Sequence, residues 1–100
     1  MKLGLNLVGP QVRKYRSKRG WTQEKLAQKM QLLGWTVSRH SLAKLELRLR
    51  RVSDCELLFL AKALGTSVNE LLPKNITYSK IGPEFQSNHR TAIFPTRAEK

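Results

Sequence analysis

Residues 20–46 read GWTQEKLAQKMQLLGWTVSRHSLAKLE, and this stretch decides the predicted fold. Thr22 and Ser38 each precede a run with apolar residues at helical spacing, and a hydroxyl at such a position caps the first turn of a helix. Gly34 follows the first run, and glycine is common just past a helix end. The stretch therefore predicts two short helices joined by a short turn, one ending at Gly34 and one capped by Ser38 and ending near Leu47.

Three more helices are predicted on either side of this pair. Pro10 suits the first position of a helix, because that residue needs no N–H partner, and Gly20 ends that helix. Ser53 and Ser67 are the N-caps of the other two helices, and Pro73 closes the domain. These three predicted helices cover residues 10–19, 54–64 and 68–72.

Together the five helices define one all-α domain. We predict a compact five-helix domain over residues 9–73, preceded by an N-terminal arm over residues 1–8. Residues 74–100 show no sustained period, so we predict an irregular, partly ordered tail with extended segments around 76–81 and 91–94.

Apolar spacing predicts which side of each helix is buried. The segment 54–64 is the most apolar and is predicted to be the central buried helix. The predicted core positions are Val12, Tyr15, Leu26, Met30, Leu33, Leu42, Leu45, Leu49 and Cys55. We expect Trp21 and Trp35 to pack beside the second helix rather than to stack on bases. Phe59 is either exposed for dimerisation or covered by the tail.

Positive charge is concentrated in the first half of the chain. The 100 residues contain 19 Lys and Arg against 7 Asp and Glu, for a formal net charge of +12. Residues 1–53 hold 13 of these cations and only two acids, Glu24 and Glu46. Such a field favours a polyanionic partner, either nucleic acid or an anionic membrane surface, and a face that only confers solubility is the alternative.

Several other classes of protein are disfavoured. No apolar run approaches the length of a membrane span, and the N-terminus lacks the pattern of a signal peptide. Cys55 is the single cysteine and cannot form an internal disulfide, so the cytoplasm is the expected location. His40 and His89 lie far apart and acids are scarce, so no catalytic set or metal-ligand spacing can be assembled. We therefore expect no enzyme, metal, cofactor or small-molecule ligand.

Two strings of residues carry a resemblance to a known family. The first is Thr-Gln-Glu-Lys-Leu-Ala at 22–27, and the second is Leu-Ala-Lys-Ala-Leu-Gly at 60–65. With Ser38-Arg39 and Leu45-Glu46 between them, they resemble the phage repressor and Cro type of helix-turn-helix, also called the XRE family, over roughly residues 9–72. The resemblance implies a lambda-repressor-like domain whose helix after Ser38 enters the major groove of DNA.

The resemblance also implies which residues contact bases. They lie at the start and on the outer face of the helix after Ser38, where helical geometry also turns side chains away from the apolar side. These base-reading residues are Arg39, His40, Ala43 and Lys44. Arg39 and Lys44 suit the O6 and N7 acceptors of guanine, and Ala43 suits a thymine methyl group.

Phosphate contacts are expected at three places. The resemblance assigns them to Gln23 and Ser41, and Thr22 stands beside Gln23 at a helix start, where free N–H groups attract anions. The family commonly carries Asn-Gly after the position of Glu46, but this chain has Leu47-Arg48. We expect phosphate contacts from the basic connector instead, with a merely solvated loop as the alternative. The connector cations are Arg48, Arg50 and Arg51.

Arg16 and Glu46 match a family ion pair between the first and third helices. Glu46 lies near the apolar side of its helix, and a carboxylate buried without a cation is costly. We therefore predict that this pair is structural and orients the recognition helix. A second departure from the family is the long connection from Ala27 to Ser38, which is predicted to lengthen the second helix.

The pattern as a whole predicts a sequence-specific double-stranded DNA-binding transcriptional regulator, most simply a repressor or Cro-like switch. A single domain makes few base contacts, so a homodimer on an inverted-repeat operator is expected. The alternative is an antitoxin-like or adaptor protein that uses the same fold to bind another protein. An RNA-binding module is a weaker alternative, because the aromatic residues are not on the basic face.

Overall fold

The structure is a computed structural model, and it describes residues 4–74 of the chain. Over these residues it contains five α-helices and no β-strand, which confirms the predicted all-α fold. The helices are α1 (Gly9–Lys18), α2 (Gln23–Leu32), α3 (Arg39–Glu46), α4 (Asp54–Leu64) and α5 (Val68–Leu71). None of the described helices is long and apolar enough to cross a membrane. The extended segments predicted around 76–81 and 91–94 lie outside the described residues.

Side-chain caps set where four of the helices begin. The hydroxyls of Thr22, Ser38, Ser53 and Ser67 each accept a hydrogen bond from the backbone N–H three residues later, at 3.0–3.1 Å. Ser53 belongs to a full capping box, because its N–H also donates to the Glu56 carboxylate at 2.9 Å. These bonds satisfy N–H groups that have no partner within the helix. The starts of these helices therefore follow from local sequence.

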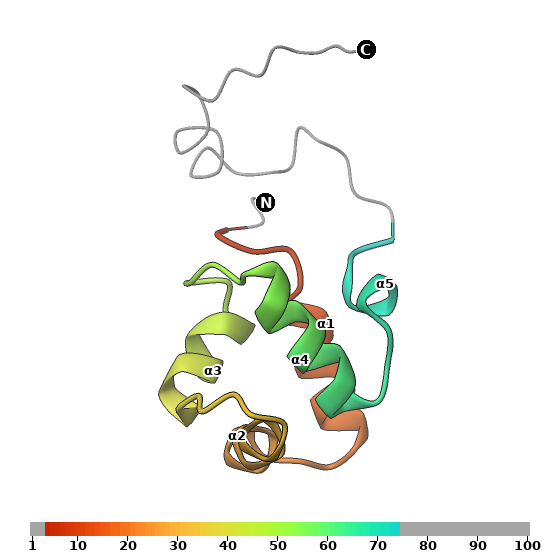
Figure 1. Ribbon diagram of the computed structural model, residues 1–100. Coiled ribbons are helices and arrows are strands. Elements are labelled where there is room, and N and C mark those ends of the chain that lie inside the picture. Colours follow the sequence, from red (N-terminus) through yellow and green to blue (C-terminus); the bar gives the residue numbers. More distant parts are fainter. Residues whose placement is uncertain (1–3, 75–100) are drawn as a thin grey trace.

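The helices surround a single core. Figure 1 shows α4 in the middle of the domain, with α1 behind it and the other helices around it. α2 packs against α3 and α4, and α1 packs against α3, α4 and α5. Fully burying one leucine side chain stabilises a fold by roughly 1.5–3 kcal/mol. The buried apolar side chains between these helices therefore hold α2 and α3 in place. The fully buried apolar side chains are Val12, Leu26, Met30, Leu42, Leu45, Leu60, Leu64 and Leu71.

Three predicted core positions are wrong, and two of them, Leu33 and Leu49, lie beyond the end of their helix. α2 ends at Leu32 rather than at Gly34, so Leu33 lies outside the helix and is 38% exposed. α3 ends at Glu46, and the chain turns at Arg48, whose φ is 64°. Leu49 consequently faces solvent and is 61% exposed. Helical spacing places a residue correctly only while the helix continues.

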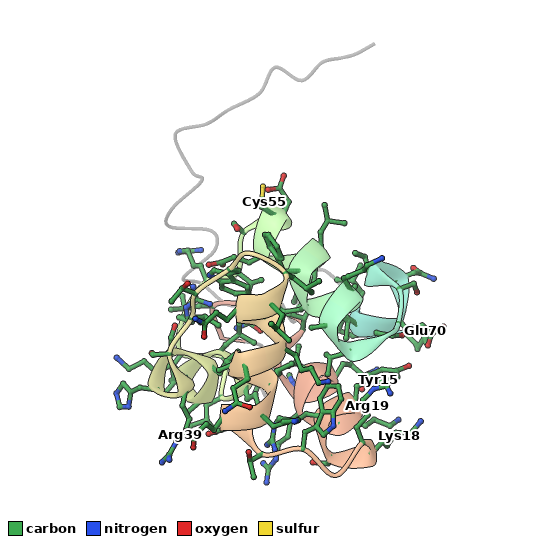
Figure 2. The ribbon with its side chains drawn as sticks, turned by 60° about the horizontal axis from the view of Figure 1, so that its bottom comes forward. Tyr15, Lys18, Arg19, Arg39, Cys55 and Glu70 are labelled. Atoms are coloured by element: carbon green, nitrogen blue, oxygen red, sulfur yellow. The ribbon has the colours of Figure 1, made fainter. Side chains whose placement is uncertain are left out.

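α4 is central in the domain, but only one of its faces is buried. Leu60, Ala61 and Leu64 face the core, whereas Leu58 is 64% exposed. Cys55 was predicted in the core and is exposed instead. Figure 2 shows it at the N-terminal end of α4, away from the body of the domain. The apolar composition of α4 predicted burial on all sides, but among residues 4–74 the packing partners of this helix cover one side only.

The segment predicted as an N-terminal arm is joined to the domain from residue 5 onward. The Leu5 N–H donates to the Arg48 carbonyl oxygen at 3.0 Å, beyond the end of α3. Asn6 and Val8 are both buried. The chain before α1 is therefore packed against the loop that follows α3.

Candidate nucleic-acid interface

α3 presents two faces of opposite character. Leu42 and Leu45 are fully buried against neighbouring helices, and this packing turns the opposite side outward. Figure 2 shows Arg39 projecting away from the domain at the start of α3. The structure brings the four predicted base-reading residues together on this outer side. Three of them are exposed and the alanine is half-buried: Arg39, His40, Lys44 and Ala43.

The N-terminal end of α3 is shaped by one hydrogen bond. The Ser38 hydroxyl accepts from the Ser41 N–H at 3.0 Å, so the Ser41 backbone is used inside the protein. The Ser41 side chain is half-buried. The other N–H groups of the first turn have no partner within the helix and lie at the positive end of its dipole. This end of α3 is therefore electropositive even before the charge of Arg39 is counted.

A buried carboxylate on α3, that of Glu46, joins α3 to α1 and α2. Glu46 is only 6% exposed, and its two oxygens accept from Arg16 Nε at 2.7 Å and from Arg16 Nη2 at 3.0 Å. Gln23 Nε2 donates to the same carboxylate at 3.1 Å. Arg16 Nη1 also donates to the Trp21 carbonyl oxygen at 2.7 Å, in the turn between α1 and α2. Arg16 and Glu46 thus form a bidentate pair, and it fixes α3 relative to α1 and α2.

The charge of Arg16 is reinforced by this arrangement. The hydrogen bond to Glu46 raises the pKa of Arg16, burial opposes that rise, and the charge of Glu46 adds to it. Arg16 therefore stays cationic at neutral pH and keeps both of its hydrogen bonds to the Glu46 carboxylate.

The start of α2 carries the two other predicted phosphate contacts. The Thr22 hydroxyl accepts from the Lys25 N–H at 3.0 Å and keeps its own O–H as a donor. Gln23 gives one amide N–H to Glu46, and a primary amide carries a second. Each residue therefore has a structural role and a further donor at the same helix end.

The connector after α3 carries three arginines that differ in exposure. Arg50 Nη2 forms an ion pair with Glu56 at 2.9 Å, so its guanidinium is directed toward the start of α4. Arg51 is exposed and Arg48 is half-buried. Arg48 occupies the left-handed region, where the family commonly has the glycine of its Asn-Gly pair. The ion pair of Arg50 with Glu56 therefore joins the connector to the start of α4.

The pairing also acts on Glu56. Partial burial alone would raise the pKa of Glu56, but hydrogen bonds from Ser53 and from Arg50, together with the positive charge of Arg50, lower it below its ordinary value. The pair and the capping box therefore hold the connector and the start of α4 together around one carboxylate.

Both tryptophan side chains contact neighbouring residues within the domain. The Trp21 ring is flanked by Arg19 and Lys29, whose cationic groups lie 5.5 and 5.2 Å from its centroid. Trp35 packs on Phe59 with ring centroids 5.9 Å apart. These contacts agree with the expectation that both tryptophans are packing residues. They also give Phe59 a partner within the domain.

Asn6 is a positioning residue that sequence reasoning missed. Its Oδ1 accepts from the N–H groups of Val8 and Gly9, at 3.1 and 2.8 Å, at the start of α1. Its Nδ2 donates to the carbonyl oxygens of Leu45 and Arg50, at 3.1 and 2.8 Å. The signal available in the sequence was a short polar side chain just before a helix start, a common way to satisfy free N–H groups. No pattern near Asn6 in the sequence indicated its bonds to the Leu45 and Arg50 carbonyl oxygens, because these residues are distant in the chain.

The arrangement of α2, α3 and the helices that support them matches a known family. A helix-turn-helix family model matches residues 12–71, which is more than half of the chain. The chain belongs to the XRE family of helix-turn-helix proteins. No curated protein and no solved structure matches the chain.

Membership of the XRE family defines the class of this site. The domain has the fold of DNA-binding transcription regulators, and α2 and α3 are its helix-turn-helix pair. Within residues 4–74, no group of three or more His, Cys, Asp or Glu side chains is placed to hold a metal ion. The exposed side chains of Arg39, His40 and Lys44 offer hydrogen-bond donors and positive charge on the outer face of α3.

Proposed function

We propose that this XRE-family protein is a sequence-specific double-stranded DNA-binding transcriptional regulator, most simply a repressor or Cro-like switch, that reads the major groove with α3. The observation that carries this proposal is the outer face of α3, where Arg39, His40 and Lys44 are exposed beside Ala43. The side chains on the opposite side of α3 are buried or ion-paired, so the helix is held in a fixed position. The exposed side chains therefore keep a fixed spacing that can match successive base pairs.

The roles of individual side chains follow from their chemistry. Arg39 and Lys44 donate to guanine O6 and N7, Ala43 packs on a thymine methyl group, and His40 donates to a base or a phosphate. Thr22, Gln23 and Ser41 supply phosphate contacts around the helix starts.

The connector after α3 completes the proposed phosphate contacts. Arg48, Arg50 and Arg51 contact the DNA backbone, and the ion pair of Arg50 with Glu56 holds the connector against the start of α4.

A homodimer on an inverted repeat supplies the specificity that one domain lacks. One recognition helix reads only a few base pairs, and two copies place their helices in successive major grooves about 34 Å apart. Regulation then consists of competitive occupancy of the operator. The logarithm of the affinity is expected to fall with the logarithm of salt concentration, with a slope of about −6 to −10 for the dimer.

Selection of binding sites from random DNA duplexes tests the proposal. The full chain is expected to enrich one palindromic motif, and Arg39→Ala and Lys44→Ala are each expected to weaken binding and relax one position in each half-site. Lys74→Ala is the matched control, because it removes one exposed charge just after α5, and Figure 1 shows α5 and α3 on opposite sides of the domain. A binding loss equal for all sequences would contradict base reading. Absence of any enriched motif, with capture of a defined protein partner, would favour the antitoxin-like or adaptor function.

A further inference from the structure

A shallow apolar groove lies on α4, on the side that does not face the core. It is lined by residues from the end of α2 and from one side of α4: Leu33, Cys55, Leu58, Phe59 and Lys62. Leu58 is 64% exposed at its centre, and Cys55 is also exposed. The Trp35 ring, from the connection between α2 and α3, packs on Phe59 beside it. Leaving an aliphatic side chain of this size in water forgoes the free energy that its burial would release.

The charges along this side of α4 are arranged symmetrically about Leu58. Asp54 lies four residues before it and Lys62 four residues after it, so all three share one side of the helix. Asp54 and Lys62 are both exposed, and neither forms an ion pair with another residue of the described segment 4–74. They are about 12 Å apart along the helix axis, too far apart to pair with each other.

We infer that this face of α4 is an interface between two copies of the chain, with the two α4 helices antiparallel across a two-fold axis near Leu58. In that arrangement Leu58 packs on its counterpart, and Asp54 of each copy lies opposite Lys62 of the other. One surface patch is thus complementary to itself, as a two-fold dimer requires. The charge pattern favours a second copy of this chain over another partner, because an antiparallel copy supplies both opposite charges. This inference rests on the proposed function, which calls for a homodimer.

The interface leaves the proposed DNA-binding face open. Figure 2 places Cys55, at the N-terminal end of α4, and Arg39, at the start of α3, on opposite sides of the view. None of the groove residues belongs to α3. A copy seated on α4 therefore does not cover the outer side of α3.

Sedimentation equilibrium of the full chain without DNA tests the contact at Leu58. The wild-type chain is expected to form a dimer at micromolar concentrations, and Leu58→Lys is expected to raise the dimer dissociation constant at least tenfold, because it places two like charges at the axis. Leu49→Lys is the matched control, since Leu49 is 61% exposed but lies outside the groove. Thermal melting of each variant checks that the domain remains folded.

A charge exchange tests the pairing itself. Asp54→Lys and Lys62→Asp are each expected to weaken the dimer about tenfold, and the double variant Asp54→Lys/Lys62→Asp to restore it to within about threefold. Both single changes oppose the dipole of α4, so the double variant is the least stable monomer. Recovery of the dimer in that variant can therefore only come from the interface.

The outcomes separate this inference from the proposed function. A chain that stays monomeric, or a dimer insensitive to Leu58→Lys and to the charge exchange, would overturn the α4 interface while leaving the motif selected by α3 intact. A dimer that responds as expected, in a chain that selects no DNA motif, would support the interface and contradict the proposed function.

Discussion

Asn6 Nδ2 donates to the Arg50 carbonyl oxygen at 2.8 Å, and this bond ties the chain before α1 to the connector after α3. The same amide nitrogen bonds the Leu45 carbonyl oxygen in the last turn of α3, and Asn6 Oδ1 caps the start of α1. A single buried amide therefore joins the start of α1, the last turn of α3 and the connector after α3. Removing it affects α3 from behind, without touching any residue on its outer face.

Asn6→Ala is expected to lower the free energy of unfolding by about 2–3 kcal/mol, because it leaves buried N–H and carbonyl groups without partners. Urea denaturation measures the change. Asn69→Ala removes an amide of the same kind from an exposed position in α5 and is the control, with an expected effect within about 0.5 kcal/mol. Equal stability of the two variants would contradict the role assigned to Asn6.

Arg16→Ala is expected to cost about 2–4 kcal/mol of stability and to weaken DNA binding at temperatures where the variant is still folded. It leaves the Glu46 carboxylate buried with only Gln23 as a partner, and it frees the turn at Trp21. Arg13→Ala removes an exposed arginine from the same helix and is the control for charge. An unchanged melting temperature for Arg16→Ala would show that the pair does not support the fold.

Gly9→Ala tests how closely α1 approaches the end of α3. A Cβ at this position would lie 2.5 Å from the Leu45 carbonyl oxygen and 2.8 Å from that of Glu46, so backbone must move. Alanine is favoured over glycine in a helix by up to about 1 kcal/mol, but the clash is expected to dominate and to destabilise the domain by about 1–3 kcal/mol. Ser17→Ala, at an exposed position of α1, is expected to be neutral or stabilising in the same urea titration.

The lowered pKa of Glu56 predicts that the folded domain loses stability in acid. Its folded-state pKa lies below the ordinary value of 4.5, so it contributes stability that is complete above that value and is lost as the pH falls through the folded-state pKa. The contribution is expected to be at most about 1 kcal/mol, since the pair with Arg50 is partly exposed.

Glu56→Gln isolates this effect, because glutamine keeps the hydrogen bond of the capping box and loses the charge. The unfolding free energy of the variant is expected to approach that of the wild type as the pH falls below 4.5. Parallel curves for the two proteins across this range would contradict the assignment.

Local chemistry determined most of the helical framework. The hydroxyls of Thr22, Ser38, Ser53 and Ser67 cap helices through bonds to N–H groups three residues away, so the sequence alone predicts these starts. The spacing of Leu42 and Leu45 likewise predicts which side of α3 is buried, and therefore which residues are left outside. A carboxylate near an apolar side requires a cation, and the family resemblance indicated that Arg16 is the partner of Glu46.

Tertiary structure decided what no local pattern contains. Leu33, Leu49 and Cys55 looked like core residues, but their exposure depends on where α2 and α3 stop and on which side of α4 has neighbours. Arg50 and Asn6 each have partners whose positions depend on the packing of several helices. Sequence by itself therefore determined the helices and the outer face of α3, because caps and periodicity act within a few residues. Burial of α4 and the clamp at Asn6 required contacts between distant segments, which exist only once the chain has folded.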